Sequence, residues 1–196
     1  MRAAGQEVAL RRRPGLLNDG PSWIHSQPSV VGSAPGPPLP VPAAITAEAF
    51  PLSRALLEAV LADRTSDQFV CELIWPRLGY EPDGSGTWSA GPATAAEWRE
   101  AFPTSPQFIA ERPPSVRLTR SIAKEFKQLL KEQLGFGGYT IGELYPRRTR
   151  RATAVNWLLA DLAERGESLA DAGPLPELLP APADPVVGHP GDLPVA

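Results

Sequence analysis

The distribution of proline along the chain limits where a folded domain can lie. Fifteen of the 24 prolines lie in residues 1–44 and 173–196. Neither end shows the apolar periodicity of a helix or a strand, so neither can bury enough apolar surface to offset the entropy lost on ordering. The sequence therefore predicts one globular domain over residues 45–170, between a disordered Pro/Gly-rich tail at 1–44 and a disordered Pro-rich tail at 171–196.

The domain carries the apolar spacing of amphipathic helices and the turn signals that separate them. Helices are expected over 53–62, from the capping box Thr65–Gln68 to Gly79, from the capping box Thr94–Glu97 to Pro103, over Ser121–Leu134, and over Pro146–Glu164. Asp83-Gly84 predicts a hairpin within "GYEPDGSGTW". The prolines of 103–114 predict extended chain, and "SVRLT" alternates like a short strand. We therefore expect a mainly α, α+β domain of four to five helices with one or two short β-hairpins.

The start of the last predicted helix is unusually basic. Within "LYPRRTRRATAVNWLLADL" it carries Arg147, Arg148, Arg150 and Arg151. The N-terminus of a helix already carries partial positive charge, so cations there are unfavourable unless anionic groups lie opposite them. On a helical wheel, Arg148 and Arg151 lie near the apolar side, whereas Arg147 and Arg150 point outward. The sequence therefore predicts an anion near this helix start.

Two interpretations of the arginines stay open. In the first, they pair with carboxylates of the same fold, for which the candidates are Asp63, Asp67, Glu72 and Glu97. In the second, they bind a phosphate, a nucleic acid or an acidic protein surface, because guanidinium groups match phosphate and carboxylate geometry. Tyr139 and Tyr145 of the adjoining "GGYTIGELY" loop, with Trp157 on the same helix, would then complete the contact surface.

A second basic group lies on and immediately before the predicted helix Ser121–Leu134, and it consists of Arg120, Lys124, Lys127 and Lys131. These side chains share one arc opposite the apolar side, which is typical of a solvated helix face. The group would support nucleic-acid binding only if it joined the arginines in a continuous basic surface.

Charge is distributed unevenly, although the net charge of the chain is only −3. Residues 111–151 carry a net charge of +6, whereas residues 45–110 carry −5 and residues 152–196 carry −6. The basic block is therefore expected either to be neutralised by its neighbours on folding or to present a basic face.

The residue sets of common catalytic and metal sites are missing from the predicted domain. His25 and His189 lie in the predicted tails, and the single cysteine, Cys71, lies in an apolar helical pattern. "GFGG" at Gly135–Gly138 follows a helix and lacks the Gly-Lys-Ser/Thr ending of a phosphate loop, which predicts a helix stop and a turn. We therefore expect no enzymatic activity, no cofactor and no bound metal.

Three strings of the predicted domain resemble one small family from cyanobacteria and plastid-bearing relatives. They are "DRTSDQFVCELIWPRLGY", "EWREAFPTSPQFIAERPPSVRLTRSI" and "KQLLKEQLGFGGYTIGELYPRRTRRATAVNWLL", and the resemblance spans about residues 50–163. The family is catalogued only as a domain of unknown function. The resemblance therefore implies a soluble protein of a cyanobacterial setting, without an established activity, cofactor or catalytic residue.

These features favour a non-enzymatic binding or adaptor module that contacts an acidic protein partner through the arginine-rich helix start. The alternative is an RNA- or DNA-binding protein that uses the same arginines together with Lys124, Lys127 and Lys131. No apolar run approaches the ~20 residues of a membrane span, and the first residues lack the apolar stretch of a secretory signal. The family resemblance implies a soluble, cytoplasmic protein, and we therefore expect a cytoplasmic location.

Overall fold

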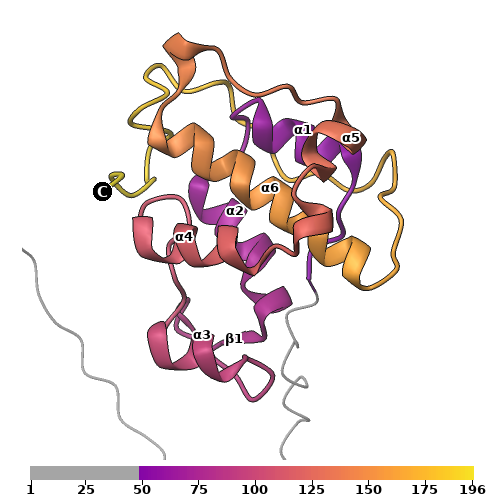
Figure 1. Cartoon of the computed structure of the whole chain (residues 1–196). Coiled ribbons are helices and arrows are strands. Elements are labelled where there is room, and N and C mark those ends of the chain that lie inside the picture. The colour runs from indigo at the N-terminus through magenta and orange to yellow at the C-terminus, as the bar shows by residue number, and fades with distance from the viewer. Residues whose placement is uncertain (1–48) are drawn as a thin grey trace, which may run out of the picture. The chain divides into compact units, whose positions relative to one another are not determined.

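A computed structural model describes residues 49–196, so the predicted tail at 1–44 lies outside the described part of the chain. Within this part, six α-helices and one two-stranded antiparallel hairpin form, which confirms the predicted mainly helical α+β class (Figure 1). The helices are α1 (Arg54–Leu61), α2 (Asp67–Ile74), α3 (Ala96–Ala101), α4 (Arg112–Ser121), α5 (Leu129–Leu134) and α6 (Pro146–Glu164). Three 3₁₀ turns accompany them: η1 (Pro76–Leu78), η2 (Lys124–Phe126) and η3 (Ile141–Glu143).

Helix α6 lies at the centre of these elements and packs against α1, α2, α4 and α5 (Figure 1). Its bounds are those predicted, with Pro146 in the first turn, where its missing N–H is not needed. The core side of α6 is provided by Ala154, Val155, Trp157, Leu158, Leu159 and Leu162, all buried. A helix with apolar residues on so many sides can be stable only when other helices cover it.

Serine side chains cap the first turns of α1 and α2. The Ser53 hydroxyl accepts a hydrogen bond from the Leu56 N–H at 3.2 Å, and the Ser66 hydroxyl accepts one from the Phe69 N–H at 3.1 Å. The cap of α2 lies one residue later than the predicted capping box places it. Between the two helices Asp63 adopts a left-handed φ of +57°, which ends α1 and turns the Asp63 carboxylate into the protein.

The predicted hairpin is present as β1 (Tyr80–Pro82) and β2 (Trp88–Ala90), paired antiparallel. Gly79 ends η1 with a left-handed φ of +84°, immediately before β1. A Cβ atom at this position would lie 2.6 Å from the backbone nitrogen of Thr94. Only glycine therefore fits at this turn, for both conformational and steric reasons.

Two sequence predictions around α4 are wrong. The chain through Pro113 and Pro114 is not extended, and "SVRLT" is not a strand, because both belong to α4, whose first turn contains the two prolines. The predicted helix Ser121–Leu134 is also broken into the end of α4, η2 and α5.

The break before α5 is stabilised by a side chain that is distant in sequence. The Asn156 side chain of α6 accepts a hydrogen bond from the Leu130 N–H at 3.0 Å and donates one to the Phe126 carbonyl at 3.3 Å. It therefore satisfies backbone groups that a continuous helix would have paired internally. Gly135, with a φ of +65°, ends α5 as predicted.

The C-terminal segment differs from the predicted free tail. Residues 171–196 form no helix or strand, in keeping with their prolines, but they contact the domain at several points. The Leu179 N–H donates to the Arg64 carbonyl at 2.9 Å, the Ala196 N–H donates to the Ala110 carbonyl at 2.9 Å, and His189 is buried. Local apolar periodicity cannot reveal such an attachment, because it depends on polar contacts with distant residues.

Candidate functional site: the arginine-rich helix start and the surface around α4

Arg147 is buried rather than outward-pointing. Its guanidinium donates to three carboxylates: Nη1 to Asp63 at 2.6 Å, Nε to Asp67 at 2.7 Å and Nη2 to Asp192 at 3.0 Å. None of its side-chain surface is exposed. Burial opposes the charged form, but the hydrogen bonds with Asp63 and Asp67 outweigh it and raise the pKa of Arg147.

Arg151 lies one helical turn further along α6 and is also buried. Its Nη1 atom contacts the Asp67 carboxylate, and its Nη2 atom donates to both the carbonyl and the hydroxyl of Thr65 at 2.9 Å. The Val60 carbonyl, at the end of α1, accepts from Nη2 at 3.1 Å. Arg151 therefore joins α6 to the turn between α1 and α2.

We refer to these buried ionic residues as the aspartate–arginine cluster, which consists of Asp63, Asp67, Asp192, Arg147 and Arg151. Of the four carboxylates considered as internal partners, Asp63 and Asp67 are the ones that pair with these arginines. Half of the arginine-rich helix start is thus neutralised within the fold, and Arg147 and Arg151 expose almost no surface while the C-terminal segment is in place.

The other two arginines of the helix start lie partly exposed. Arg148 donates to Glu143 at 3.1 Å and lies 5.4 Å from the ring centroid of Tyr139, within cation–π distance. Arg150 donates to the backbone carbonyls of Ile109 at 2.9 Å and Ala110 at 2.8 Å, and to the main-chain oxygen of Ala196, the last residue of the sequence, at 2.6 Å. Within the described part of the chain, Arg150 is therefore held in place without an aspartate or glutamate side chain to balance its charge.

The predicted aromatic contacts separate into a buried and a half-buried group. Trp157 is buried in α6, where its indole N–H donates to the Ser121 hydroxyl at 3.0 Å, so it packs α4 against α6. Tyr139 and Tyr145 are half-buried in the loop between α5 and α6. Among these three aromatic residues, only the two tyrosines have side-chain surface that a partner could contact.

Three adjoining pockets surround α4. A pocket of about 830 Å³ separates α4 from α3, and it is lined by Arg112, Arg117 and Arg120 among others. A pocket of about 430 Å³ follows at the start of α6, and it shares Arg112 with the first. A third, of about 480 Å³, lies between α5, α6 and the loop between them, and it shares Leu144 with the second. We call these three pockets together the α4 surface.

Six basic side chains line the α4 surface, and they are Arg112, Arg117, Arg120, Lys127, Lys131 and Arg150. One acidic residue, Glu97, lines it. Within residues 49–196, none of the six basic side chains forms an ion pair with an aspartate or glutamate side chain. Burial lowers the pKa of Arg150, and repulsion by the nearby Arg112 lowers it further. The α4 surface therefore concentrates positive charge that the acidic side chains of the described residues leave unpaired.

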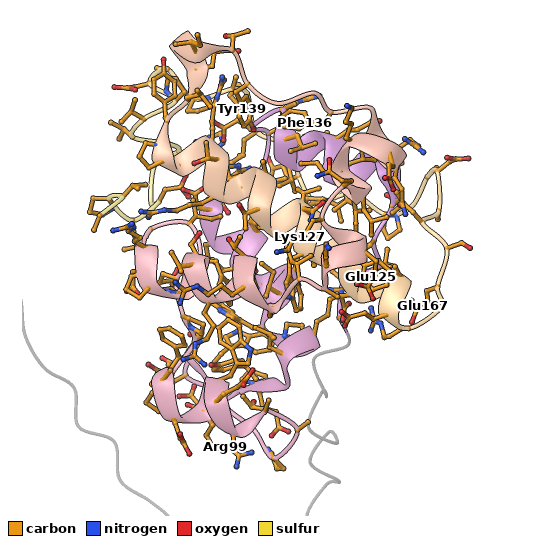
Figure 2. All side chains as sticks on the ribbon, in the orientation of Figure 1. Arg99, Glu125, Lys127, Phe136, Tyr139 and Glu167 are labelled. Atoms are coloured by element: carbon orange, nitrogen blue, oxygen red, sulfur yellow. The ribbon has the colours of Figure 1, made fainter. Side chains whose placement is uncertain are left out.

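The second predicted basic group does not form one helical stripe, because η2 interrupts the helix. Arg120 lines the pocket next to α3, whereas Lys127 and Lys131 line the pocket next to α6. Lys124 is exposed on η2 and lines none of the three pockets. Figure 2 shows Lys127 on the segment before α5, and Phe136 and Tyr139 on the loop that follows α5. Tertiary structure thus joins part of this group to the loop that was predicted as a contact surface.

Sequence reasoning did not identify Arg112 and Arg117 as site residues, because their segment was predicted to be extended. The available signal was helical spacing, since Arg112, Val116 and Arg120 recur every four residues and Arg117 follows Val116 directly. Arg117 lies 5.8 Å from the Trp98 ring centroid and donates to the Glu97 carbonyl at 2.9 Å, which fixes it between α3 and α4.

Residues 49–196 hold no group of three or more His, Cys, Asp or Glu residues placed to bind a metal ion. The carboxylates that do gather, in the aspartate–arginine cluster, face guanidinium groups instead. In the same part of the chain, no helix is both long and apolar enough to cross a bilayer.

Cys71 is expected to be unreactive in the folded protein. It is buried in α2, and burial raises the pKa of its thiol to about 12. At pH 8 the reactive thiolate is then about a thousandfold scarcer than in the unfolded chain. We expect a thiol reagent such as 5,5′-dithiobis(2-nitrobenzoate) to react only as the protein unfolds. Rapid labelling of the native chain, with its circular dichroism unchanged, would contradict this prediction.

Comparison with known proteins was consistent with the resemblance noted in the sequence. No curated protein matches the chain. The chain is similar to a protein solved by solution NMR, at 46% identity and a TM-score of 0.52, over 61% of this chain and 100% of that protein. Residues 51–163, which include α1 to α6 almost completely, match the family described as "Domain of unknown function (DUF1823)". The chain therefore belongs to this family.

Proposed function

We propose that the domain is a non-enzymatic binding module that holds an acidic segment of a protein partner on the α4 surface. The observation that carries the proposal is the charge of this surface, which is lined by six basic side chains and one acidic side chain. Arg112 and Arg150 lie close enough to repel each other, and a carboxylate placed between them would relieve that repulsion.

Apolar side chains beside these charges favour a protein as the partner. Leu144 lines two of the three pockets and is 54% exposed, and Ile141 in the adjoining η3 is 92% exposed. Phe136, Leu130 and Ile122 form the apolar lining of the pocket that also contains Lys127 and Lys131. A peptide that alternates acidic and apolar residues would match both features, since interfaces combine an apolar centre with complementary charge.

The aromatic ring beside the α4 arginines is less suited to nucleic acid. Trp98 is buried beneath Arg117, so its ring has no free face on which a base could stack. Arg147 and Arg151 were candidates for phosphate contacts from the sequence, but both are already bound to carboxylates. An acidic protein segment therefore accounts for the α4 surface better than an RNA or DNA strand does.

Charge reversal on α4 tests this proposal. The probe is a fluorescent synthetic peptide in which aspartate and glutamate alternate with leucine and phenylalanine. We expect Arg112→Glu to weaken its binding about tenfold or more, because attraction becomes repulsion at the centre of the surface. Glutamate at the first position of α4 suits the helix dipole, so the variant is expected to fold. Fluorescence anisotropy at several salt concentrations measures the affinity.

Arg64→Glu provides the matched control, because Arg64 is an exposed arginine that lines none of the three pockets. It makes the same change of charge and is expected to leave the affinity within about twofold of the unmodified chain. A peptide with asparagine and glutamine in place of the acids should not bind. Equal losses in both variants, or tighter binding of a single-stranded oligonucleotide with a steep salt dependence, would contradict the proposal.

A further inference from the structure

Both oxygens of the Asp192 carboxylate accept hydrogen bonds from the protein, in the way that a bound ligand would. One oxygen, Oδ1, accepts from the backbone N–H of Asp67 at 2.8 Å. The other, Oδ2, accepts from Nη2 of Arg147 at 3.0 Å and from the N–H of His189 at 2.8 Å. Only 1% of the Asp192 side chain is exposed. The donors on Asp67 and Arg147 belong to α2 and α6, whereas Asp192 and His189 belong to the irregular C-terminal segment.

Asp192 is the surplus charge of the aspartate–arginine cluster. Arg147 and Arg151 are already balanced by Asp63 and Asp67, all within residues 51–163 of the family match. If Asp192 left, two cations would still face two anions. The cluster therefore does not require Asp192 for charge balance, although the departure would leave two donors, on Arg147 and Asp67, without an acceptor.

Both donors would keep their positions without the segment. Nη1 and Nε of Arg147 are fixed by Asp63 and Asp67 at 2.6 and 2.7 Å, so Nη2 cannot turn away. The N–H of Asp67 lies at the start of α2, which Ser66 caps. A rigid guanidinium next to an N–H at a helix start is a preorganised site for a carboxylate.

The segment approaches this site through a glycine that cannot be replaced freely. Gly188 has a φ of +95°, and a Cβ atom there would lie 2.6 Å from both Nε of Arg147 and Oδ2 of Asp192. The ring nitrogen Nε2 of His189 lies 3.0 Å from the Asp63 carbonyl. The site therefore favours an extended segment in which a glycine lies against Arg147, as Gly188 does, and an aspartate follows a few residues later, as Asp192 does.

We propose that Arg147 and the start of α2 form a peptide-binding site for an aspartate carboxylate, and that residues 184–196 are its exchangeable internal ligand. A partner whose extended segment carries a glycine followed by an aspartate displaces the segment and occupies the same donors. The donors of this site line none of the three pockets of the α4 surface, but Ala196 at the end of the segment accepts a hydrogen bond from Arg150 of that surface.

Two full-length variants test the inference by releasing the segment in different ways. Asp192→Asn removes the carboxylate charge, and Gly188→Ala introduces the clashing Cβ while it leaves the donors and Asp192 intact. The probe is a fluorescent peptide with the sequence of residues 184–196. We expect it to bind both variants about tenfold or more tightly than the unmodified chain, whose own segment competes. Hydrogen exchange of residues 184–196 should be faster in both variants.

The matched peptide carries asparagine in place of its aspartate and is expected to bind both variants about tenfold or more weakly, since it lacks the charge-assisted bond. Circular dichroism and urea unfolding establish that the variants fold. Equal affinity of the probe for the variants and the unmodified chain, or equal affinity of the two peptides, would overturn the inference. Loss of cooperative folding in both variants would also overturn it, because the segment would then be part of the fold.

Discussion

Arg147→Met is expected to lower the free energy of unfolding by about 3–5 kcal/mol, because it leaves buried carboxylates without their partner. Arg147 donates to Asp63, Asp67 and Asp192, and none of its side-chain surface reaches solvent. After the substitution, Arg151 would be the one arginine left in a cluster of three carboxylates, and it pairs with Asp63 and Asp67 but not with Asp192. Methionine keeps much of the volume of the arginine stem, so the loss reports charge and hydrogen bonding rather than a cavity. Urea unfolding followed by tryptophan fluorescence at pH 7 measures it.

Arg148→Met is the matched control for this prediction, since Arg148 is the neighbouring residue of the same helix. Its ion pair is with Glu143, whose side chain is 48% exposed, so we expect a far smaller loss than at Arg147. Arg147→Lys should lie between the two, because lysine keeps the charge but cannot reach three carboxylates at once. Similar losses for Arg147→Met and Arg148→Met would show that the aspartate–arginine cluster does not stabilise the fold.

Trp75→Ala is expected to cost about 3–5 kcal/mol of stability, as large truncations in a close-packed core do. Trp75 follows α2 and is 1% exposed, and its ring centroid lies 5.7 Å from that of Trp88. Its indole N–H donates to the Pro106 carbonyl at 2.9 Å, which ties α2 to the segment between α3 and α4. The substitution therefore removes ring packing and a link between distant segments together.

Trp75→Phe separates these two contributions. Phenylalanine keeps an aromatic ring but leaves the Pro106 carbonyl without its donor, and the expected loss is about 1–3 kcal/mol. Chemical unfolding by circular dichroism is the suitable measurement, because both substitutions remove a fluorescent tryptophan. If Trp75→Ala were no more destabilising than Trp75→Phe, the packing of the ring would not be the main contribution.

The elements that the sequence predicted well are those whose signals are local. The last helix follows the predicted bounds Pro146–Glu164, because a proline in the first turn and a long apolar pattern suffice to define it. The hairpin follows from Asp83-Gly84, and α1 lies within the range 53–62 that its apolar spacing predicts. Each of these signals acts over a few residues, so the rest of the fold does not need to be known.

The prediction around α4 failed because two opposing local signals were weighed without their tertiary context. Proline breaks a helix in its interior but is well tolerated in its first turn, where Pro113 and Pro114 lie. The burial of Leu118 in the core then favours a helix over an extended strand for this segment. The break before α5 likewise depends on Asn156, which satisfies the free backbone groups from another helix. With α4 misassigned, Arg112 and Arg117 could not be recognised as residues of a basic surface.

The sequence by itself determined that arginines at the start of α6 must meet anions, because helix dipole and like charge make any other arrangement unfavourable. Only the tertiary structure decided which of these arginines pair with carboxylates of the same chain. A helical wheel refers to one apolar side, whereas α6 is also covered at its start by the turn that carries Asp63 and by the segment that carries Asp192. Arg147 is buried there because three carboxylates from distant parts of the chain converge on it, and no local spacing encodes that convergence.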